Sequence, residues 1–323
     1  MKIRIDLNVP GWTKWLVSGI GIGFVLGVGG ARVYADTVDV KTDWQPGDTL
    51  TASDLNTSFA HLKAAIDQLK YPDCPEDYTR DTAVDDRVLC KQGPDEVVKV
   101  GAGGSVFWID RYEATIWANT NATGTQYGRS SASEYPSTFP ENGEYTSALY
   151  ALSVAGKKPS AYMTWFQAQA ACRLGGKRLP TGEEWLMAAL GTPDPDAHTG
   201  DGGFCVTSAS GPRNTGGGTA CVSQWGAEDM IGNLWEWTAD WYAGLGDSGV
   251  NHAWTRDTYA GDGTWNLASS AHDGTAWQVG LPAAALRGGH WDLGSQAGRF
   301  ALSLSNAPSN RASAIGLRCV LAR

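Results

Sequence analysis

The stretch that decides the fold lies at the C-terminal end and reads, from Leu286 to Arg323, LRGGHWDLGSQAGRFALSLSNAPSNRASAIGLRCVLAR. Its Gly288-Gly289 pair permits backbone conformations that other residues avoid, and its large apolar side chains can be buried. From residue 299 to 305 apolar residues alternate with small or polar ones, which predicts a strand with Phe300, Leu302 and Leu304 on its core face. The outward face would carry Arg299, Ala301, Ser303 and Ser305. Two interpretations of that face remain open: an ordinary half-buried strand, or part of a recognition surface.

Composition favours a loop-rich domain. The 323 residues are 42% hydrophobic, which suffices for a full core in one large domain or two. A net charge of −9 argues against a nucleic-acid partner, because binding phosphates needs a basic patch. The 41 glycines and 15 tryptophans indicate irregular segments held by large aromatic side chains. We therefore expect a mixed α+β fold with much coil.

Residues 1–35 have the pattern of an export signal. Lys2, Arg4 and Lys14 precede an apolar run, and Val33 and Ala35 stand where small residues precede a cleavage site. The run is short and rich in glycine for a membrane-spanning helix, although an uncleaved membrane anchor is the alternative. We expect an exported protein that is periplasmic, secreted or held at the cell surface.

Residues 36–70 are expected to form a stalk. Apolar residues recur there at spacings of 4, 3, 4 and 3, which is the seam of a short coiled coil: Leu55, Phe59, Leu62, Ile66 and Leu69. If the seam associates, the 50–70 helix would make a homo-oligomer such as a trimer. The alternative is a single amphipathic helix docked on the main domain.

The main domain is expected at residues 71–323, stabilised by disulfides. The six cysteines show neither a CxxC motif nor a cysteine–histidine spacing typical of zinc sites. Cys74 with Cys90, and Cys205 with Cys221, are the simplest mutual pairs, each closing a short loop.

Local patterns predict several elements of this domain. Residues 105–115 have the aromatic and β-branched character of a strand, and residues 118–155 look like a long surface excursion. Residues 164–174 predict a helix. Thr181 and Glu184 form a capping box for the next helix, which Gly191 can terminate.

Four motifs then occur in a recognisable order. They are GGKRLPTGEEW (residues 175–185), WGAEDMIGNLWEWTADWY (225–242), LRGGHW (286–291) and IGLRC (315–319), with IDRYEAT (109–115) before them. In this order they resemble the formylglycine-generating enzyme, or sulfatase-modifying factor, family. The resemblance implies an irregular, loop-rich α+β fold of the C-type lectin-like kind. It also implies a disulfide between Cys172 and Cys319.

The same resemblance bears on catalysis. Active members of the family need two reduced thiols shortly after the RGG motif, where the thiols bind copper and oxidise a substrate cysteine. Here no cysteine lies between Gly288 and Arg318, and residues such as Leu293 and Gly298 stand in that region. His290 beside Trp291 is expected to be structural or at the surface. We therefore expect no copper and no catalytic residue.

A structural calcium ion is a further implication of the family. The matching ligands would be the carboxylates of Asp229 and Glu236 and the carbonyls of Gly232 and Leu234, all hard oxygen donors. The equal alternative is that Asp229 and Glu236 cap the loop and form salt bridges without metal.

The closing stretch also resembles the variable region of proteins diversified by retroelements, in which a fixed frame carries mutable positions. A protein or surface ligand would contact those positions, with Trp291 and Trp235 as aromatic anchors. The candidate ligand-binding positions are Trp291, Asp292, Leu293, Ser295, Gln296, Arg299, Ser303, Ser305, Arg311, Ala312, Ser313 and Ala314. The leading hypothesis is thus an exported binding or adhesion protein. The alternatives are a formylglycine-generating oxidoreductase and an accessory structural protein of the cell envelope.

Overall fold

The computed structural model describes residues 53, 56–57, 59–61, 73–82, 87–101, 106–193, 203–243, 264–266 and 282–321. The chain divides into two compact units, Met1–Pro72 and Asp73–Arg323.

In the first unit, the described residues of the expected stalk are helical: Ser53, Asn56, Thr57 and Phe59–His61. The side chain of Phe59 is exposed. The other seam residues and the export segment 1–35 lie outside the described residues, so the stalk, its oligomer and the signal stay predictions. Among the helices that the structure describes, none is both long and apolar enough to cross a membrane.

The second unit contains three sheets. The first has the strand order β1-β2-β3-β4-β14-β8, and its strands are β1 Thr79–Arg80, β2 Leu89–Gln92, β3 Asp95–Val100, β4 Phe107–Asp110, β14 Val320–Leu321 and β8 Lys177–Arg178. The second has the order β10-β12-β11-β9-β13, with β10 Thr264–Asn266, β12 Gly298–Leu304, β11 Pro282–Gly288, β9 Trp235–Ala243 and β13 Ile315–Leu317. The third, β6-β5-β7, consists of Gln126–Tyr127, Thr115–Trp117 and Tyr150–Leu152. Long irregular segments join these short strands, so the loop-rich α+β prediction is confirmed.

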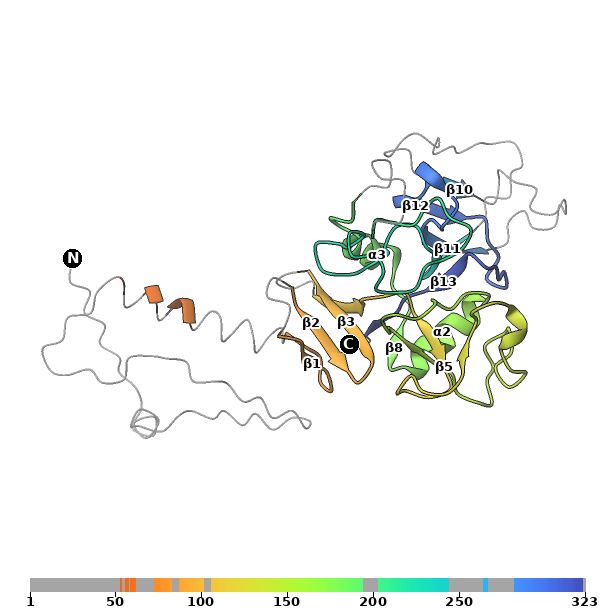
Figure 1. Cartoon of the computed structure of the whole chain (residues 1–323), viewed down its shortest axis with the longest axis horizontal. Coiled ribbons are helices and arrows are strands. Elements are labelled where there is room, and N and C mark those ends of the chain that lie inside the picture. Colours follow the sequence, from red (N-terminus) through yellow and green to blue (C-terminus); the bar gives the residue numbers. More distant parts are fainter. Residues whose placement is uncertain are drawn as a thin grey trace, which may run out of the picture. The chain divides into compact units, whose positions relative to one another are not determined.

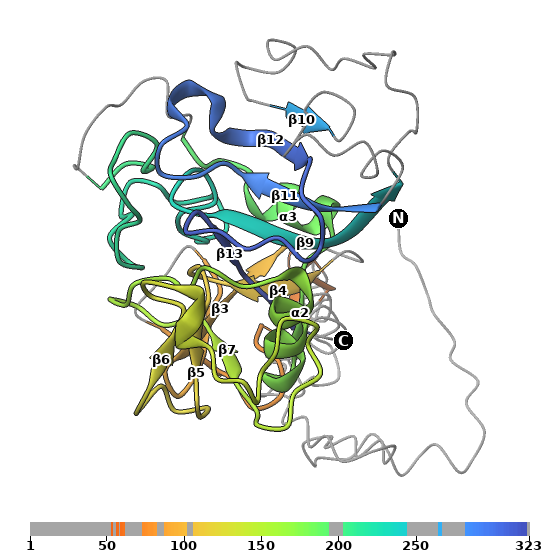
Figure 2. The same cartoon turned by 90° about the vertical axis from the view of Figure 1, so that its right-hand side faces the viewer.

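Two helices pack against the sheets where the sequence predicts them. Helix α2, Trp165–Leu174, lies against β7 and β8, and helix α3, Gly182–Ala188, lies against β9 and β11 (Figure 1 and Figure 2). A capping box starts each helix. Thr181 accepts from the amide of Glu184 at 3.1 Å, and the Glu184 carboxylate accepts from the amide of Thr181 at 2.9 Å.

The predicted strand at residues 105–115 divides into two. β4 pairs with β3 and β14 in the first sheet, whereas β5 pairs with β6 and β7 in the third. Residues 111–114 carry the chain from one sheet to the other, and the amide of Ala114 donates to the carbonyl of Leu317 at 2.8 Å. This hydrogen bond beside the third sheet therefore links it to strand β13.

The segment 118–155 is more than a surface excursion. It contributes Phe139 and Leu149 to the main hydrophobic cluster, where both are buried beside Trp237 and Leu286. The sequence did not reveal that these two residues are buried, because each stands alone among polar residues and turns and forms no periodic apolar pattern.

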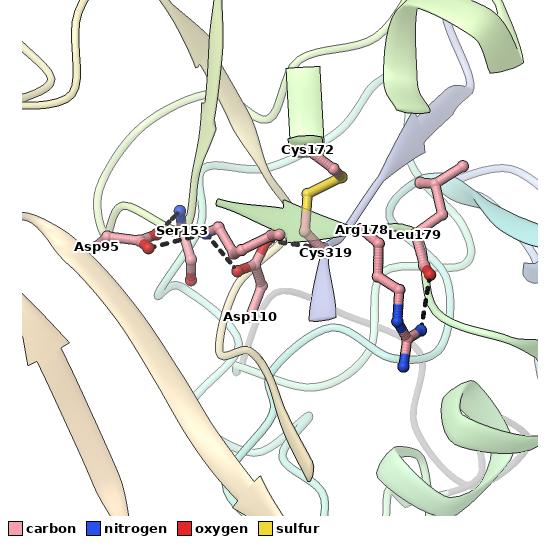
Figure 3. Close-up of a disulfide and its surroundings, with 8 residues drawn as sticks. Asp95, Asp110, Ser153, Cys172, Arg178, Leu179 and Cys319 are labelled. Atoms are coloured by element: carbon pink, nitrogen blue, oxygen red, sulfur yellow. Dashed lines mark hydrogen bonds and ion pairs between the residues drawn. A yellow bond between two sulfur atoms is a disulfide. The ribbon is translucent and has the colours of Figure 1, made fainter. Parts of the chain in front are cut away.

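The three disulfides join the predicted pairs Cys74–Cys90, Cys172–Cys319 and Cys205–Cys221. Figure 3 shows Cys172, on α2, bonded to Cys319, directly before β14. This bond ties the start of β14 to α2, the helix that lies against the neighbouring strand β8.

The face assignment on β12 is wrong by one residue. Ala301 and Ser303 are buried, and Phe300, Leu302 and Leu304 are only half-buried. β12 pairs with β11 on one side and β10 on the other, and Ala301 joins the cluster that contains Leu286. The alternation was predicted correctly, but the small side chains face the core: Ala301 lies in the main cluster, and the Ser303 hydroxyl is satisfied there by Ser305 and Asn306.

Candidate ligand-binding face

The candidate positions lie on β12 and on the two connections beside it. The first connection, residues 289–297, joins β11 to β12, and the second, residues 305–314, joins β12 to β13. Figure 2 shows β12, β11, β9 and β13 lying side by side in the sheet that carries both connections. We call the accessible side chains of the two connections, together with Arg299 at the start of β12, the candidate face.

Glycine is required where the first connection begins. Gly288 and Gly289 have φ of 90° and 85°, a region that disfavours other residues. A Cβ on Gly289 would lie 2.6 Å from the Cβ of Ala297, so the two ends of the connection meet at van der Waals contact. The RGG motif thereby closes this turn tightly.

Backbone hydrogen bonds hold the first connection. The amide of Trp291 donates to the carbonyl of Asn233 at 3.0 Å, and the carbonyl of Trp291 accepts from the amide of Ala209 at 2.8 Å. The amide of Gly294 donates to the carbonyl of Thr207 at 2.7 Å. None of these bonds uses a side chain of the candidate face.

The second connection is held in the same way. Its carbonyls accept from the amides of residues outside it: Pro308 from Trp165 at 2.9 Å and Ala312 from Tyr162 at 3.0 Å. The carbonyl of Ala314 accepts from the amide of Trp235 at 2.8 Å. Because Asn233 and Trp235 hold one connection each, the two connections are neighbours.

Most candidate side chains are accessible on this backbone. Those of Asp292, Ser295, Arg311 and Ser313 are exposed. Half-buried positions are Trp291, Leu293, Gln296, Arg299, Ala312 and Ala314. Leu293 and Ala312 also pack against the main cluster, so they form the apolar floor on which the exposed side chains of the face stand.

Two charged side chains of the face have neighbours that orient them. Arg311 forms an ion pair with Glu141, and the Arg299 guanidinium lies over the Phe300 ring, 4.9 Å from its centroid. Burial lowers the pKa of His290, with Asp292 opposing that shift, and the lowered pKa favours the neutral imidazole. The face thus mixes acidic, basic and hydroxyl groups on a neutral, partly apolar floor.

Three sequence-predicted contacts are not on the face. Ser303 and Ser305 are only 4% and 8% exposed, and their hydroxyls lie 3.1 Å apart. The side-chain amide of Asn306 donates to Ser303 at 2.9 Å, so these hydroxyls form a buried polar network. Trp235 is buried as well and cannot serve as an exposed anchor. All three are therefore buried: Ser303 on β12, Ser305 directly after that strand, and Trp235 at the start of β9.

An aromatic cluster was missed by the sequence interpretation. Trp241 is 40% exposed near the end of β9, and its ring lies 5.0 Å from that of Trp165 and 5.9 Å from that of Phe166. Trp165 also holds the second connection through its backbone amide. The WEWTADWY motif contains the aromatic residue Trp241, but the alternation of the motif does not show at which residue of β9 burial ends.

Beneath the face, three recognised motifs meet at one buried ion pair. The Arg318 guanidinium donates to both oxygens of Glu236 at 2.7–2.9 Å, and the Trp185 indole donates to the same carboxylate at 2.7 Å. Burial disfavours the charge on Arg318, but the Glu236 carboxylate together with Glu113 and Asp110 outweighs that effect, so the Arg318 pKa is raised. The motif residues therefore have an interior, structural role.

A model of the sulfatase-modifying factor enzyme 1-like domain matches residues 81–323. The chain belongs to this family. The inactive C-alpha-formylglycine-generating enzyme 2 of Bos taurus is 32% identical over 109 residues, which are 26% of this chain and 33% of that protein. Hercynine oxygenase of Mycolicibacterium smegmatis is 32% identical over 99 residues, covering 27% of this chain and 22% of that enzyme. The match to these curated relatives thus spans about a fifth to a third of their length.

Among solved structures, the U1 variant of Major Tropism Determinant is similar to this chain at 21% identity with a TM-score of 0.44. The alignment covers 76% of this chain and 55% of that one.

The calcium site implied by the sulfatase-modifying factor family fits these residues poorly. Asp229 is paired with Arg213, and both oxygens of Glu236 accept from Arg318. The positive charge that a metal ion would bring to these two carboxylates is therefore already supplied by arginine guanidinium groups. Among the described residues, no group of three or more His, Cys, Asp or Glu side chains is arranged to hold a metal ion. The geometry favours the metal-free alternative, and calcium binding by Asp229, Gly232, Leu234 and Glu236 stays a prediction to be tested.

Copper chemistry of the family's enzymes needs free thiols, and the cysteines of this chain are used elsewhere. All six are joined in the three disulfides. Cys319 follows the face in sequence, yet it is buried and bonded to Cys172. Position 293 holds a leucine that packs on the core, and position 298 a glycine that starts β12. The face thus offers polar contacts and no nucleophilic sulfur.

Proposed function

We propose that this protein is an exported, non-catalytic binding or adhesion protein that presents the candidate face to a protein or surface ligand. One observation carries the proposal: backbone atoms hold both connections, while the side chains between those bonds are accessible. A surface of this kind can change its side chains without losing its shape. The finer proposal is that a retroelement diversifies these positions.

The chemistry of the face suits recognition. Asp292, Ser295, Gln296, Arg311 and Ser313 supply donors and acceptors of both charges, and Trp291 supplies a flat aromatic surface. Paratopes combine rigid aromatic anchors with adaptable polar contacts in the same manner. The exposed Trp241 beside the second connection adds a further aromatic contact.

Export is supported by the three disulfides, because such bonds persist in oxidising compartments. Fractionating cells that express the full chain, and sequencing the N-terminus of the product, tests this part. An exported product that begins at Asp36 is expected for a cleaved signal, and an intact N-terminus in the membrane fraction for an anchor. A cytoplasmic product with reduced cysteines would contradict export.

Binding is tested by displaying two libraries of the domain. One library randomises Asp292, Ser295, Gln296, Arg311 and Ser313, and the control randomises an equal number of exposed positions remote in sequence from the face. Selection against a panel of purified proteins should give saturable binders from the face library only. Equal yields from both libraries, or loss of folded protein from the face library, would contradict the assignment of the face.

Diversification has its own test in the DNA. We expect a near-copy of the last part of the gene downstream, together with a reverse transcriptase gene. Their absence would remove diversification and leave simple binding.

The alternative enzyme function is tested directly. The purified protein is incubated with copper and a peptide that carries a CxPxR sequence, and the peptide is weighed. We expect no mass change, since no thiol is free, and conversion of the peptide cysteine to formylglycine would overturn the non-catalytic proposal. One relative carries the word inactive in its name, so the family accommodates members without this activity. Loss of envelope integrity in a deletion strain, without loss of ligand binding, would favour the accessory structural role.

A further inference from the structure

A lysine and two aspartates meet in the interior of the first sheet, away from the candidate face. Lys177 lies on β8, Asp95 on β3 and Asp110 on β4. Their side chains are 0%, 3% and 0% exposed. Figure 3 shows Asp95 and Asp110 approaching the same place beside the Cys172–Cys319 disulfide. Nothing in the binding function uses this cluster.

The three groups are in direct contact. The Lys177 Nζ lies 2.8 Å from both oxygens of Asp95 and 2.7 Å from Oδ1 of Asp110. Asp95 also accepts from the Tyr78 hydroxyl and from the amide of Ser153. The amide of Cys319 donates to Oδ2 of Asp110 at 2.8 Å. The lysine nitrogen is thus held in hydrogen-bond contact with two carboxyl groups in a buried site.

The charges cannot all be compensated as ions. One ammonium faces two carboxylates, so the cluster would have a net negative charge in a dry interior, which is costly. Burial raises the pKa of Asp110 to about 7; Lys177 opposes this rise and Asp95 adds to it. The neutral state of the cluster therefore has one proton on Asp110.

We propose that the Lys177 Nζ condenses with the Asp110 carboxyl group to form an intramolecular amide bond that cross-links β8 to β4.

The reaction needs no group from outside the cluster. The Lys177 ammonium gives a proton to the Asp95 carboxylate, and the neutral amine attacks Cγ of the protonated Asp110. The Cys319 amide, already bonded to Oδ2, stabilises the negative charge that develops on that oxygen. The C–O bond to Oδ1 then breaks, and the proton that Asp95 has taken passes to the departing hydroxyl, which leaves as water. The second ammonium proton returns to Asp95, so the products are the amide, one water molecule and a protonated Asp95.

The partners of each carboxyl group assign these roles. Asp95 contacts the lysine nitrogen through both of its oxygens at 2.8 Å, so it is placed to accept the lysine proton, and Tyr78 and the amide of Ser153 hold it in that orientation. Asp110 has the donor on Oδ2 that a tetrahedral intermediate requires, and its raised pKa keeps it partly protonated. Burial of all three side chains also excludes the water that would hydrolyse the product.

The bond would reinforce the strand order of the first sheet. β14 lies between β4 and β8, and Cys319 precedes β14. The amide would therefore join the two neighbours of β14, and the disulfide would tie the same place to α2. A domain displayed outside the cell would gain resistance to pulling and to proteolysis from such a pair of covalent links.

The experiment is an intact-mass measurement on the full chain, purified from an oxidising compartment, reduced, and incubated at pH 7. We expect the wild-type mass to be lower by one water molecule than the mass calculated for the chain from its sequenced N-terminus with all cysteines reduced. A tryptic digest should contain one branched peptide that joins Asp110 to Lys177, with no cleavage after Lys177.

Variants separate the proposed step from other losses of water. Lys177→Arg keeps the charge without the nucleophile, and Asp95→Asn removes the base; both should have the full sequence mass. Lys157→Arg alters an exposed lysine and should keep the loss of water. The three disulfides, counted by thiol labelling before reduction, show that each variant has folded. A wild-type protein at full sequence mass overturns the proposal, and so does a branched peptide through any residue other than Asp110.

Discussion

The candidate face and the protein interior differ in which atoms hold their residues in place. On the face, main-chain atoms make the positioning bonds, such as Trp291 to Asn233 and Trp235 to Ala314. In the interior, side chains make them, as in the Arg318–Glu236 pair and the Lys177 cluster. The interior therefore demands specific residues, whereas the face demands only a backbone path. Substitutions at both kinds of site can test this difference.

The largest effect is expected from the long disulfide. Replacing Cys172 and Cys319 by serine opens a link between residues 147 apart in sequence, which should lower the free energy of unfolding by about 4–5 kcal/mol. The matched control, serine at Cys205 and Cys221, opens a link of separation 16 and should lower it by about 3 kcal/mol. Urea unfolding measures both. A smaller loss for the long link than for the short one would contradict the ranking.

Arg318→Met leaves the Glu236 carboxylate buried without its cation. We expect a loss of about 3–5 kcal/mol in the free energy of unfolding, because an unpaired buried charge is expensive. Arg178→Met breaks the partly exposed pair with Glu184 and should cost about 1 kcal/mol or less. Similar losses for the two variants would show that the buried ion pair contributes no more to stability than the partly exposed one.

Two serines of the C-terminal stretch, one buried and one exposed, test where the candidate face ends and the interior begins. Ser303→Tyr forces a large side chain into the buried network and should cost about 1–3 kcal/mol. Ser313→Tyr adds the same side chain at an exposed position and should change stability by no more than about 0.5 kcal/mol. Thermal unfolding of the two variants is the measurement. If Ser313→Tyr is the more destabilising, the candidate face is misplaced.

The smallest effect concerns calcium. With Arg213 on Asp229 and Arg318 on Glu236, we expect a chelator to leave the melting temperature unchanged. A midpoint that falls on chelation and recovers with added calcium would show a bound metal, because a ligand of the native state stabilises it.

Much of the fold follows from local patterns. The capping box at Thr181 and Glu184 requires only residues three apart, and the strand at 107–110 requires only its aromatic and β-branched composition. The Cys172–Cys319 bond was accessible through the family motifs alone, since nothing local relates residues so far apart in sequence.

The candidate site was predicted less completely. The alternation around Phe300 and Leu302 identified a strand, but which side is covered depends on what packs there. The same limit explains Trp235, buried at the start of β9, and Trp241, exposed toward its end.

The sequence by itself indicated the family and the α+β class, because the motifs and helix caps depend on which residues stand at short, fixed spacings. It suggested the two short disulfides as the simplest pairs, and the Cys172–Cys319 bond only through the family resemblance. Only the tertiary structure decided which side of β12 faces the core, which arginine neutralises Asp229, and that Lys177 meets Asp95 and Asp110. Those outcomes depend on contacts between residues far apart in the chain. Such contacts are fixed by the volume and charge available when the layers pack, and no local pattern records them.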